Sequence, residues 1–237
     1  MKYIVSNELK QQEIHNKEIT DMVPWIVLDG SFERVLSSNF KKEGKERRSI
    51  LDIGCGGGST LIAAKDYFGT FSGIDIVDER AGNLPIRIDF AKVDLNFEKL
   101  PYPDAVFDMV TAFQTIEHLE NPFFVMREAK RVLKSGGIFM MSVPNPYHIS
   151  FKIKYLFTSN MPPWTEMNNH LTFLTKDVFK KTYLKEFDLV ETIYQRGSIP
   201  FWGRLRLILG KRVGKHKMVL PRSEAFGRRI GFVLRKK

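Results

Sequence analysis

Short apolar runs alternate with amphipathic stretches along most of the chain, and this alternation predicts an α/β fold. The pattern predicts helices at residues 59–69, 122–133 and 176–185. Runs with the length and composition of strands lie at 49–53, 71–76, 88–93, 107–112, 138–143, 189–194 and 229–234. Because strands that alternate with helices form parallel pairs, we expect a doubly wound, seven-stranded, mostly parallel sheet.

The segments that flank or interrupt this alternation suggest how the chain is organised. Residues 1–48 are predicted to form an N-terminal helical cap and a charged linker, and residues 49–237 the α/β domain. Residues 145–170 follow the fifth strand and form an irregular insertion rich in aromatic side chains. Residues 201–222 mix basic and apolar positions in a basic amphipathic segment.

Length and composition fit one domain of this kind. The chain has 237 residues, of which 43% are hydrophobic, enough for one sizeable core. No apolar run approaches the roughly 18 residues needed to span a bilayer, and the N-terminus turns polar too soon for a signal peptide. Cys55 is the single cysteine, so it has no partner for an internal disulfide, and a cytoplasmic location is expected.

The charge is unevenly distributed. Residues 196–237 carry thirteen Lys or Arg and one acid, a net charge of +12, whereas the whole chain carries +10. Such asymmetry is typical of a protein with an anionic partner, although a solvated basic face is the simpler interpretation. Apolar residues recur at helical spacing in residues 201–220, so this segment could lie on an anionic membrane surface or pack as an ordinary surface helix.

A glycine-rich turn follows the first predicted strand. Four glycines fall within residues 54–58, and Ser59 can cap a helix that starts there. Asp75 ends the second strand, at a spacing suited to accepting hydrogen bonds from two ribose hydroxyls. The turn and the helix start predict a nucleotide-type cradle. A P-loop is excluded because no Gly-Lys-Ser/Thr follows, whereas a dinucleotide site stays open, with Ser59 at its last fingerprint position.

The ordered set of motifs resembles the class I S-adenosylmethionine-dependent methyltransferases. It is most similar to the small-molecule group that contains the ubiquinone and menaquinone biosynthesis enzymes (methyltransferase type 11/23). The motifs are Leu-Asp-Ile-Gly-Cys-Gly-Gly-Gly at 51–58, Gly-Ile-Asp at 73–75, Asp-Leu at 94–95, Leu-Pro-Tyr-Pro-Asp at 100–104, Phe-Asp-Met-Val at 107–110, Ile-Glu-His-Leu at 116–119 and Arg-Val-Leu-Lys-Ser-Gly-Gly at 131–137. The resemblance implies a Rossmann-like fold with S-adenosylmethionine as cofactor.

By this resemblance, particular residues would hold each part of the cofactor. The loop formed by Gly54, Cys55 and Gly56 would meet the methionine moiety, and Asp52 would hold its ammonium group. The remaining implied contacts are Asp75 with the ribose, Asp94 and the Leu95 N–H with the adenine, Ile76 and Leu95 on the two adenine faces, and Gln114 near the methionine end. Turn and cap formation is the alternative role for the aspartates. The family's usual helix between strands two and three is missing, because residues 77–85 are too short and too rich in Gly and Pro.

Two histidines are candidate general bases for an acceptor hydroxyl. His118 follows the fourth strand, at the start of the expected helix and on the cofactor side of the sheet, and His170 ends the aromatic insertion. Histidine suits proton transfer at neutral pH, although local hydrogen bonding is the commoner role. His148 is a weaker candidate, and Glu117 could orient His118. No metal ligands are predicted.

These features predict methyl transfer to a small or lipid-like acceptor, most plausibly at oxygen. Base-methylating DNA enzymes carry Asp/Asn-Pro-Pro-Tyr/Phe after strand four, where residues 112–115 have no proline. The aromatic insertion suggests a hydrophobic acceptor, or a cap that packs on the sheet. The alternatives are an RNA or protein methyltransferase that uses the basic segment, a non-catalytic S-adenosylmethionine-binding module and a dinucleotide oxidoreductase. The expected location is cytoplasmic or membrane-peripheral.

Overall fold

The computed structural model describes residues 23–166, 168–196, 198–199, 218–219 and 221–237. The first 22 residues of the predicted N-terminal helical cap and most of the basic amphipathic segment 201–222 lie outside these residues. The division of the chain at residue 48 stays a prediction.

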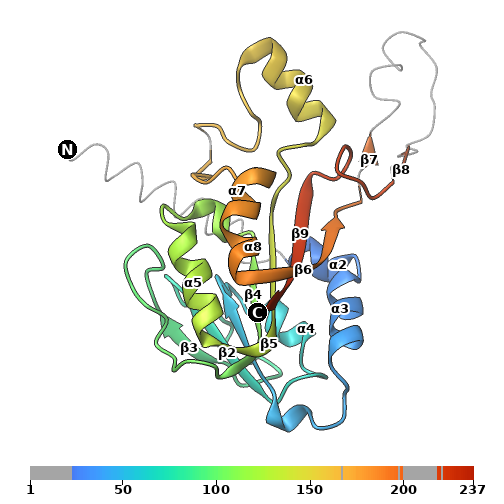
Figure 1. The fold of residues 1–237 in the computed structure, drawn as a ribbon. Coiled ribbons are helices and arrows are strands. Elements are labelled where there is room, and N and C mark those ends of the chain that lie inside the picture. The colour runs from blue at the N-terminus through green and yellow to red at the C-terminus, as the bar shows by residue number, and fades with distance from the viewer. Residues whose placement is uncertain (1–22, 167, 197, 200–217, 220) are drawn as a thin grey trace.

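A seven-stranded sheet forms the centre of the fold, in the order β3-β2-β1-β4-β5-β9-β6 (Figure 1). The strands are β1 Ser49–Ile53, β2 Thr70–Asp75, β3 Asp89–Lys92, β4 Phe107–Phe113, β5 Leu133–Pro144, β6 Phe187–Tyr194 and β9 Arg229–Lys236. Pairs from β3 to β5 are parallel, and β9 runs antiparallel to both of its neighbours. The predicted doubly wound, mostly parallel sheet is confirmed. A separate two-stranded sheet joins β7 (Ser198–Ile199) to β8 (Met218–Val219).

Helices cover both faces of the sheet (Figure 1). They are α2 Trp25–Leu28, α3 Ser31–Asn39, α4 Ser59–Ala63, α5 Pro122–Val132, α6 Ile149–Thr158, α7 Lys176–Lys181 and α8 Tyr183–Glu186, with 3₁₀ turns η1 Lys45–Arg47 and η2 Ile116–His118. Neighbouring strand residues face opposite sides, so Met109 packs with α2, α3 and α4 whereas Val110 packs with α5 and α8. Apolar cores on both faces explain the continuous hydrophobic runs of the central strands.

Several element boundaries differ from the sequence prediction. The helix predicted at 59–69 ends at Ala63, and left-handed Gly58, rather than Ser59, occupies its N-cap. The helix predicted at 176–185 breaks at Thr182 into α7 and α8. The fifth strand begins at Leu133 instead of residue 138, because Leu133 pairs with Phe107 beyond an irregularity in the register.

The insertion at 145–170 was predicted to be irregular, and this prediction was wrong over α6. His148 caps the helix, since its Nδ1 accepts from the Ser150 N–H at 3.2 Å. The predicted lack of a helix between β2 and β3 is confirmed, because no helix occurs between Ile76 and Ile88.

Arg131 joins α5 to the loop that precedes β4. Its guanidinium donates to the carbonyls of Leu100 and Tyr102 at 2.9 and 2.7 Å, and to Glu128 Oε2 at 2.7 Å. The same Glu128 oxygen accepts from the Leu100 N–H at 3.0 Å. Because Arg131 donates to Glu128 and carries the opposite charge, the pKa of the Glu128 carboxyl lies below its usual range.

We predict that Arg131→Met lowers the free energy of unfolding by about 2–4 kcal/mol, because it leaves a largely buried carboxylate and two carbonyls without their donor. Urea denaturation measures this loss. The control is Lys42→Met, whose ion pair with Asp66 is long and exposed, at 4.0 Å. It is expected to cost less than about 0.5 kcal/mol. Equal losses in the two variants would contradict this role of Arg131.

Candidate functional site

A cavity of about 900 Å³ opens at the carboxyl ends of the central strands. It lies where the strand order reverses, between β1 and β4, which is where open α/β sheets bind ligands. Every predicted site residue lines it: Asp52, Gly54, Cys55, Gly56, Asp75, Ile76, Asp94, Leu95, Gln114, His118 and His170. The structure therefore brings the predicted residues together, while their individual roles stay predictions.

The turn after β1 is held close to the end of β2. The N–H groups of Gly54 and Cys55 both donate to the Ile74 carbonyl, at 2.8 and 3.0 Å. Gly54 has a φ of +73°, and a Cβ built there would overlap the Thr115 hydroxyl. Only glycine fits this position, because a side chain would meet both the strained backbone conformation and Thr115. The loop backbone consequently forms one wall of the cavity.

Asp75 stands beside this loop at the end of β2. Its Oδ2 accepts from the Gly56 N–H at 2.9 Å, and its Oδ1 accepts from the Ile76 N–H at 2.8 Å. A carboxylate has about four lone-pair positions, so these bonds fix the side chain and leave further acceptor capacity. The carboxylate can therefore accept further hydrogen bonds from a ligand in the cavity.

Asp52 is a buried carboxyl beneath the glycine loop. It is 2% exposed, and its Oδ1 accepts from the Thr111 hydroxyl at 2.6 Å. Burial raises its pKa to about 7. A cationic ligand nearby would favour the charged form, so the site suits an ammonium group. Cys55 is also buried, which raises the pKa of its thiol and makes it a poor nucleophile.

The third strand end supplies a further polar and apolar pair. Asp94 Oδ1 accepts from the Asn96 N–H at 3.0 Å, a turn contact that matches the alternative role considered for this aspartate. Leu95 is buried at the cavity wall, and Ile76, which directly follows Asp75, lines the cavity with about half of its surface exposed. Both readings of Asp94 are compatible, since a carboxylate accepts more than one hydrogen bond.

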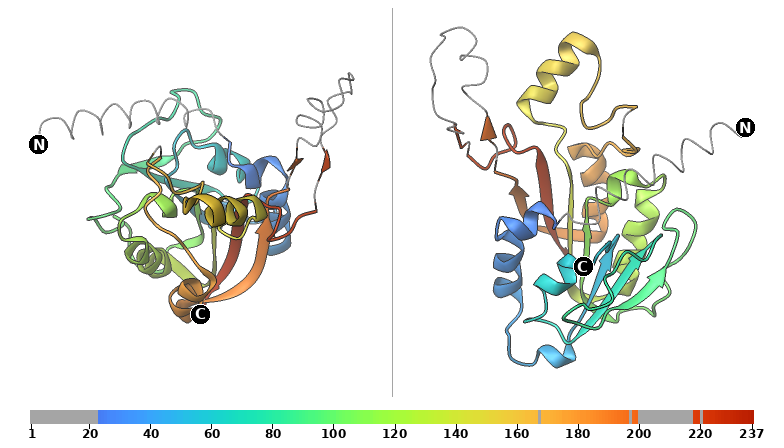
Figure 2. Two further views of the ribbon diagram at one scale, coloured as in Figure 1. Left: turned by 90° about the horizontal axis from the view of Figure 1, so that it is seen from above. Right: turned by 180° about the vertical axis from the view of Figure 1, so that it is seen from behind.

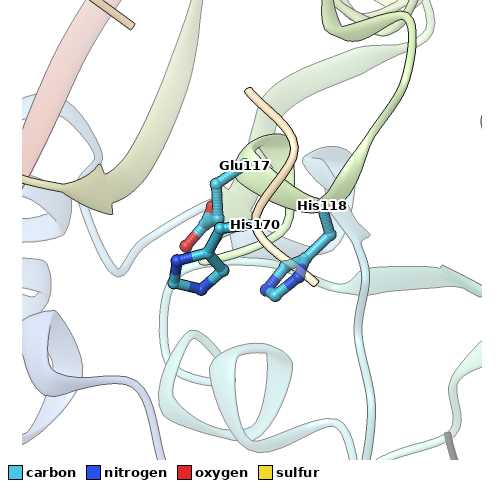
Figure 3. A group of neighbouring side chains, drawn as sticks. All are labelled: Glu117, His118 and His170. Carbon is cyan, nitrogen blue, oxygen red and sulfur yellow. The ribbon is translucent and has the colours of Figure 1, made fainter. Parts of the chain in front are cut away.

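Glu117 lies in the 3₁₀ turn η2 at the cavity wall (Figure 3). It is 1% exposed, and burial raises its pKa to about 8. Its Oε1 accepts from Gln114 Nε2 at 3.4 Å, whereas Oε2 has no hydrogen-bond partner among the described residues. Gln114 itself has a positive φ of 57°, a strained conformation that concentrates at functional sites. Because the pKa of Glu117 lies near 8, its carboxyl is largely neutral at pH 7.

His118 and His170 meet beside Glu117, although 51 residues of chain lie between them (Figure 3). Their rings are 4.8 Å apart in an edge-to-face arrangement. His118 was predicted to lie at the start of a helix. It instead ends the short 3₁₀ turn η2, so that prediction was wrong. One ligand atom from each of Glu117, His118 and His170 lies within 4.8 Å of the others, so this group could hold a metal ion.

Hydrogen bonds with the turn η2 bring His170 to the cavity. The N–H groups of Leu171 and Thr172 donate to the Glu117 carbonyl at 2.7 and 3.0 Å. His170 Nδ1 contacts the Pro163 carbonyl, which accepts only, so Nδ1 carries the proton. His148, the weaker candidate, is not among the cavity residues and caps α6 instead.

Sequence reasoning missed several residues of the cavity wall. They are Trp25, Phe113, Arg228 and Arg229, which come from α2, the end of β4 and the start of β9. No local motif identifies them, because the two ends of the chain meet only in the folded state. In the part of the chain that the structure describes, no helix is long and apolar enough to cross a membrane.

Comparison with known proteins finds similarity that is concentrated in the central part of the chain. Residues 51–141 match the family described as "Methyltransferase domain". A ubiquinone biosynthesis O-methyltransferase from Dinoroseobacter shibae is 30% identical over 160 residues, which cover 63% of this chain and 62% of that protein. A probable S-adenosylmethionine-dependent methyltransferase from Mycolicibacterium smegmatis is 36% identical over 101 residues, covering 41% and 38%.

The solved structures agree on the fold. A protein from Bacillus halodurans, described as a putative methyltransferase, superposes with a TM-score of 0.59 at 19% identity, covering 86% of this chain and 98% of that one. At this identity the likeness concerns the fold alone. The chain spans less than two thirds of the length of the curated relatives named above.

The buried Glu117 predicts a pH dependence of stability. A carboxyl whose folded-state pKa is raised from 4.5 to about 8 binds a proton in the folded protein over a range where the unfolded chain has lost it. This group therefore makes stability fall as pH rises from about 4.5 to about 8, with no further fall above that range.

We predict that Glu117→Gln removes this part of the fall, so that the variant gains stability over the native chain between pH 5 and pH 8. Urea denaturation across this range measures the difference. Glu120→Gln is the control, since Glu120 lies exposed two residues after η2. A constant difference between Glu117→Gln and the native chain across the range would contradict the raised pKa.

Proposed function

We propose that this protein transfers the methyl group of S-adenosylmethionine to an oxygen of a small or lipid-like acceptor. The basis is the match of residues 51–141 to a methyltransferase domain and the similarity to S-adenosylmethionine-dependent methyltransferases. The observation that carries this proposal is the single cavity that joins the predicted cofactor residues to two histidines. A volume of about 900 Å³ is at the upper end of the roughly 300–1,000 Å³ typical of small-molecule sites, so a cofactor and an acceptor fit together.

The chain's polar groups fit the methionine and ribose parts of the cofactor. Gly54 and Gly56 let the loop backbone approach a carboxylate closely. Asp52 would pair with the ammonium group, whose charge would offset the cost of ionising a buried carboxyl. Asp75, fixed by two backbone donors, would accept from both ribose hydroxyls.

The neighbouring strand ends fit the adenine. Asp94 would accept from the exocyclic amino group, and the Leu95 N–H would donate to a ring nitrogen. The side chains of Ile76 and Leu95 would cover the two faces of the ring. Gln114, placed by the strained turn after β4, would lie near the methionine end.

The chemistry needs an oriented acceptor and a place for its proton. When bound, the cofactor supplies an electrophilic methyl group on a sulfonium. The cavity would hold the acceptor oxygen in line with the methyl group, and this positioning can supply much of the acceleration. His118 or His170 would take the hydroxyl proton, since a neutral imidazole nitrogen is a suitable base near pH 7. Glu117, neutral beside them, would not compete for that proton at this pH.

Several observations support an apolar acceptor. Phe151 and Pro163 of the insertion line the same cavity as the residues proposed to bind the cofactor. The Dinoroseobacter relative is a ubiquinone biosynthesis O-methyltransferase, and a second relative, from Amycolatopsis mediterranei, is a 27-O-demethylrifamycin SV methyltransferase. Both relatives carry names that describe methyl transfer at oxygen.

The basic C-terminal part of the chain favours a second candidate, an RNA or protein substrate. Residues 196–237 carry the net charge of +12, and RNA bound there would show a steep salt dependence. The insertion beside the cavity is aromatic rather than basic, which favours the small acceptor. Membrane contact through residues 201–220 is a related proposal, although most of that segment lies outside the described residues.

We expect Asp75→Ala to weaken S-adenosylmethionine binding about 10- to 100-fold, because two hydrogen bonds to a charged acceptor are lost. Equilibrium dialysis with radiolabelled cofactor measures the dissociation constant. Asp78→Ala is the matched control, because Asp78 follows on the same loop and pairs with Arg80 outside the cavity. Equal affinities for the two variants would contradict the assigned role of Asp75.

For the histidines, we expect His118→Gln or His170→Gln to lower kcat about 10²- to 10⁴-fold with little change in cofactor affinity. Methyl transfer is measured with a prenylated phenol, an amine and RNA as alternative acceptors. The phenol should be the acceptor that is methylated. In whichever histidine variant retains measurable activity, the pH at which kcat is half-maximal should differ from that of the native chain. Preferred methylation of RNA, or full kcat in both variants, would overturn the proposed acceptor chemistry.

A further inference from the structure

The outer face of α6 carries apolar side chains that the rest of the described chain leaves uncovered. Ile149, Ile153, Leu156 and Phe157 are 41%, 51%, 78% and 81% exposed. Their spacing of four, three and one residues places them on a single face of an α-helix. Figures 1 and 2 show α6 projecting beyond the sheet and the other described helices. This outer face, defined by these four residues, is the reverse of the usual arrangement, in which the apolar stripe packs on the core.

The opposite side of α6 is anchored to the body of the protein. Phe151 is buried and its ring packs on His148, 4.8 Å away between centroids. The N–H of Ile149 donates to the Ala225 carbonyl at 2.8 Å. The helix is therefore held at its first turn, by a backbone hydrogen bond and by a side chain that does not belong to the outer face.

The charges around the outer face all have one sign. Lys152 and Lys154 flank the apolar stripe on its two sides, and both are exposed. No Asp or Glu occurs between residues 129 and 165. Among the described residues, neither lysine forms an ion pair within 4.0 Å. Lys152 Nζ lies 5.6 Å from the centre of the Tyr147 ring, a contact that leaves its charge without an acidic partner.

We propose that α6 docks on an anionic lipid bilayer, with the outer face immersed in the interface and the lysines at the level of the headgroups. Apolar residues on one side, basic residues beside them and a lack of acids are the features by which an interfacial helix binds such membranes. A second copy of this chain is a poorer occupant, because a symmetric contact would bring the lysines of two helices together without an acid to compensate.

Docking in this orientation would place the bilayer near the cavity. Phe151, on the anchored side of the same helix, lines the cavity, as does Pro163 just beyond the helix. A membrane bound by the outer face would therefore lie close to the acceptor side of the cavity. The delivery of a lipid-like acceptor rests on the proposed function, whereas docking itself requires neither cofactor nor methyl transfer.

The test is flotation of the full chain with phosphatidylcholine vesicles, with and without phosphatidylglycerol. We expect binding to the anionic vesicles only. Leu156→Gln should lower the partition coefficient roughly tenfold, because one immersed leucine is lost. Lys152→Gln and Lys154→Gln should each lower it about fivefold. The matched control, Leu28→Gln, changes a leucine that is 72% exposed on α2 and should bind like the native chain.

Three results would overturn the proposal: no binding to anionic vesicles, equal binding by Leu156→Gln and Leu28→Gln, or equal binding to neutral and anionic vesicles. Equal binding by the two leucine variants would assign the membrane contact to another part of the chain. A concentration-dependent dimer that Leu156→Gln abolishes, without vesicle binding, would identify a second copy as the occupant. S-adenosylmethionine affinity, measured on the same variants, should not change, so failure of docking and failure of the proposed methyl transfer are distinguished.

Discussion

The close approach of the β1 turn to the end of β2 is the constraint on which the site depends. Two successive N–H groups, from Gly54 and Cys55, share the Ile74 carbonyl, and this is possible because Gly54 adopts a left-handed conformation against Thr115. The same turn carries the Gly56 N–H that holds Asp75. The position of the Asp75 carboxylate, and with it the shape of the cavity at the ends of β1 and β2, follows from one glycine.

The cavity also concentrates buried acids whose protonation depends on what they contact. Asp52 and Glu117 are both at most 2% exposed, and burial raises the pKa of each into or near the physiological range. Asp52 lies at the glycine loop, where a cationic group would draw it into the charged form. Glu117 lies beside the histidines and stays neutral there. The two acids therefore give the two ends of one cavity different electrostatic character.

Most of the residues proposed to bind the cofactor could be predicted, because they belong to short motifs. In these motifs a strand, a turn and one polar side chain follow each other directly. Asp52, Gly54 and Asp75 are of this kind. The helix α6 could not be predicted as readily, because it is capped by a histidine and its apolar residues face outward rather than toward a core. The early start of β5 depends on pairing between Leu133 and Phe107, which local sequence does not reveal.

The far side of the cavity was the hardest to predict. His170 reaches Glu117 only because the chain after the insertion bonds to the carbonyl of that residue in η2, and sequence distance gives no sign of this contact. Trp25 and Arg229 enter the wall from opposite ends of the chain for the same reason. Non-local packing of this kind decides which residues of the insertion and of the chain's two ends line the cavity, whereas motifs identify the residues proposed to bind the cofactor.

The most direct measurement of the central claim is calorimetric titration of the native chain with S-adenosylmethionine and, separately, with NAD. The account predicts one S-adenosylmethionine bound per chain with a dissociation constant on the order of micromolar, about −8 kcal/mol, and no heat of binding with NAD. Binding of NAD, or no binding of S-adenosylmethionine, would contradict the assignment of this cavity as a methyl-donor site.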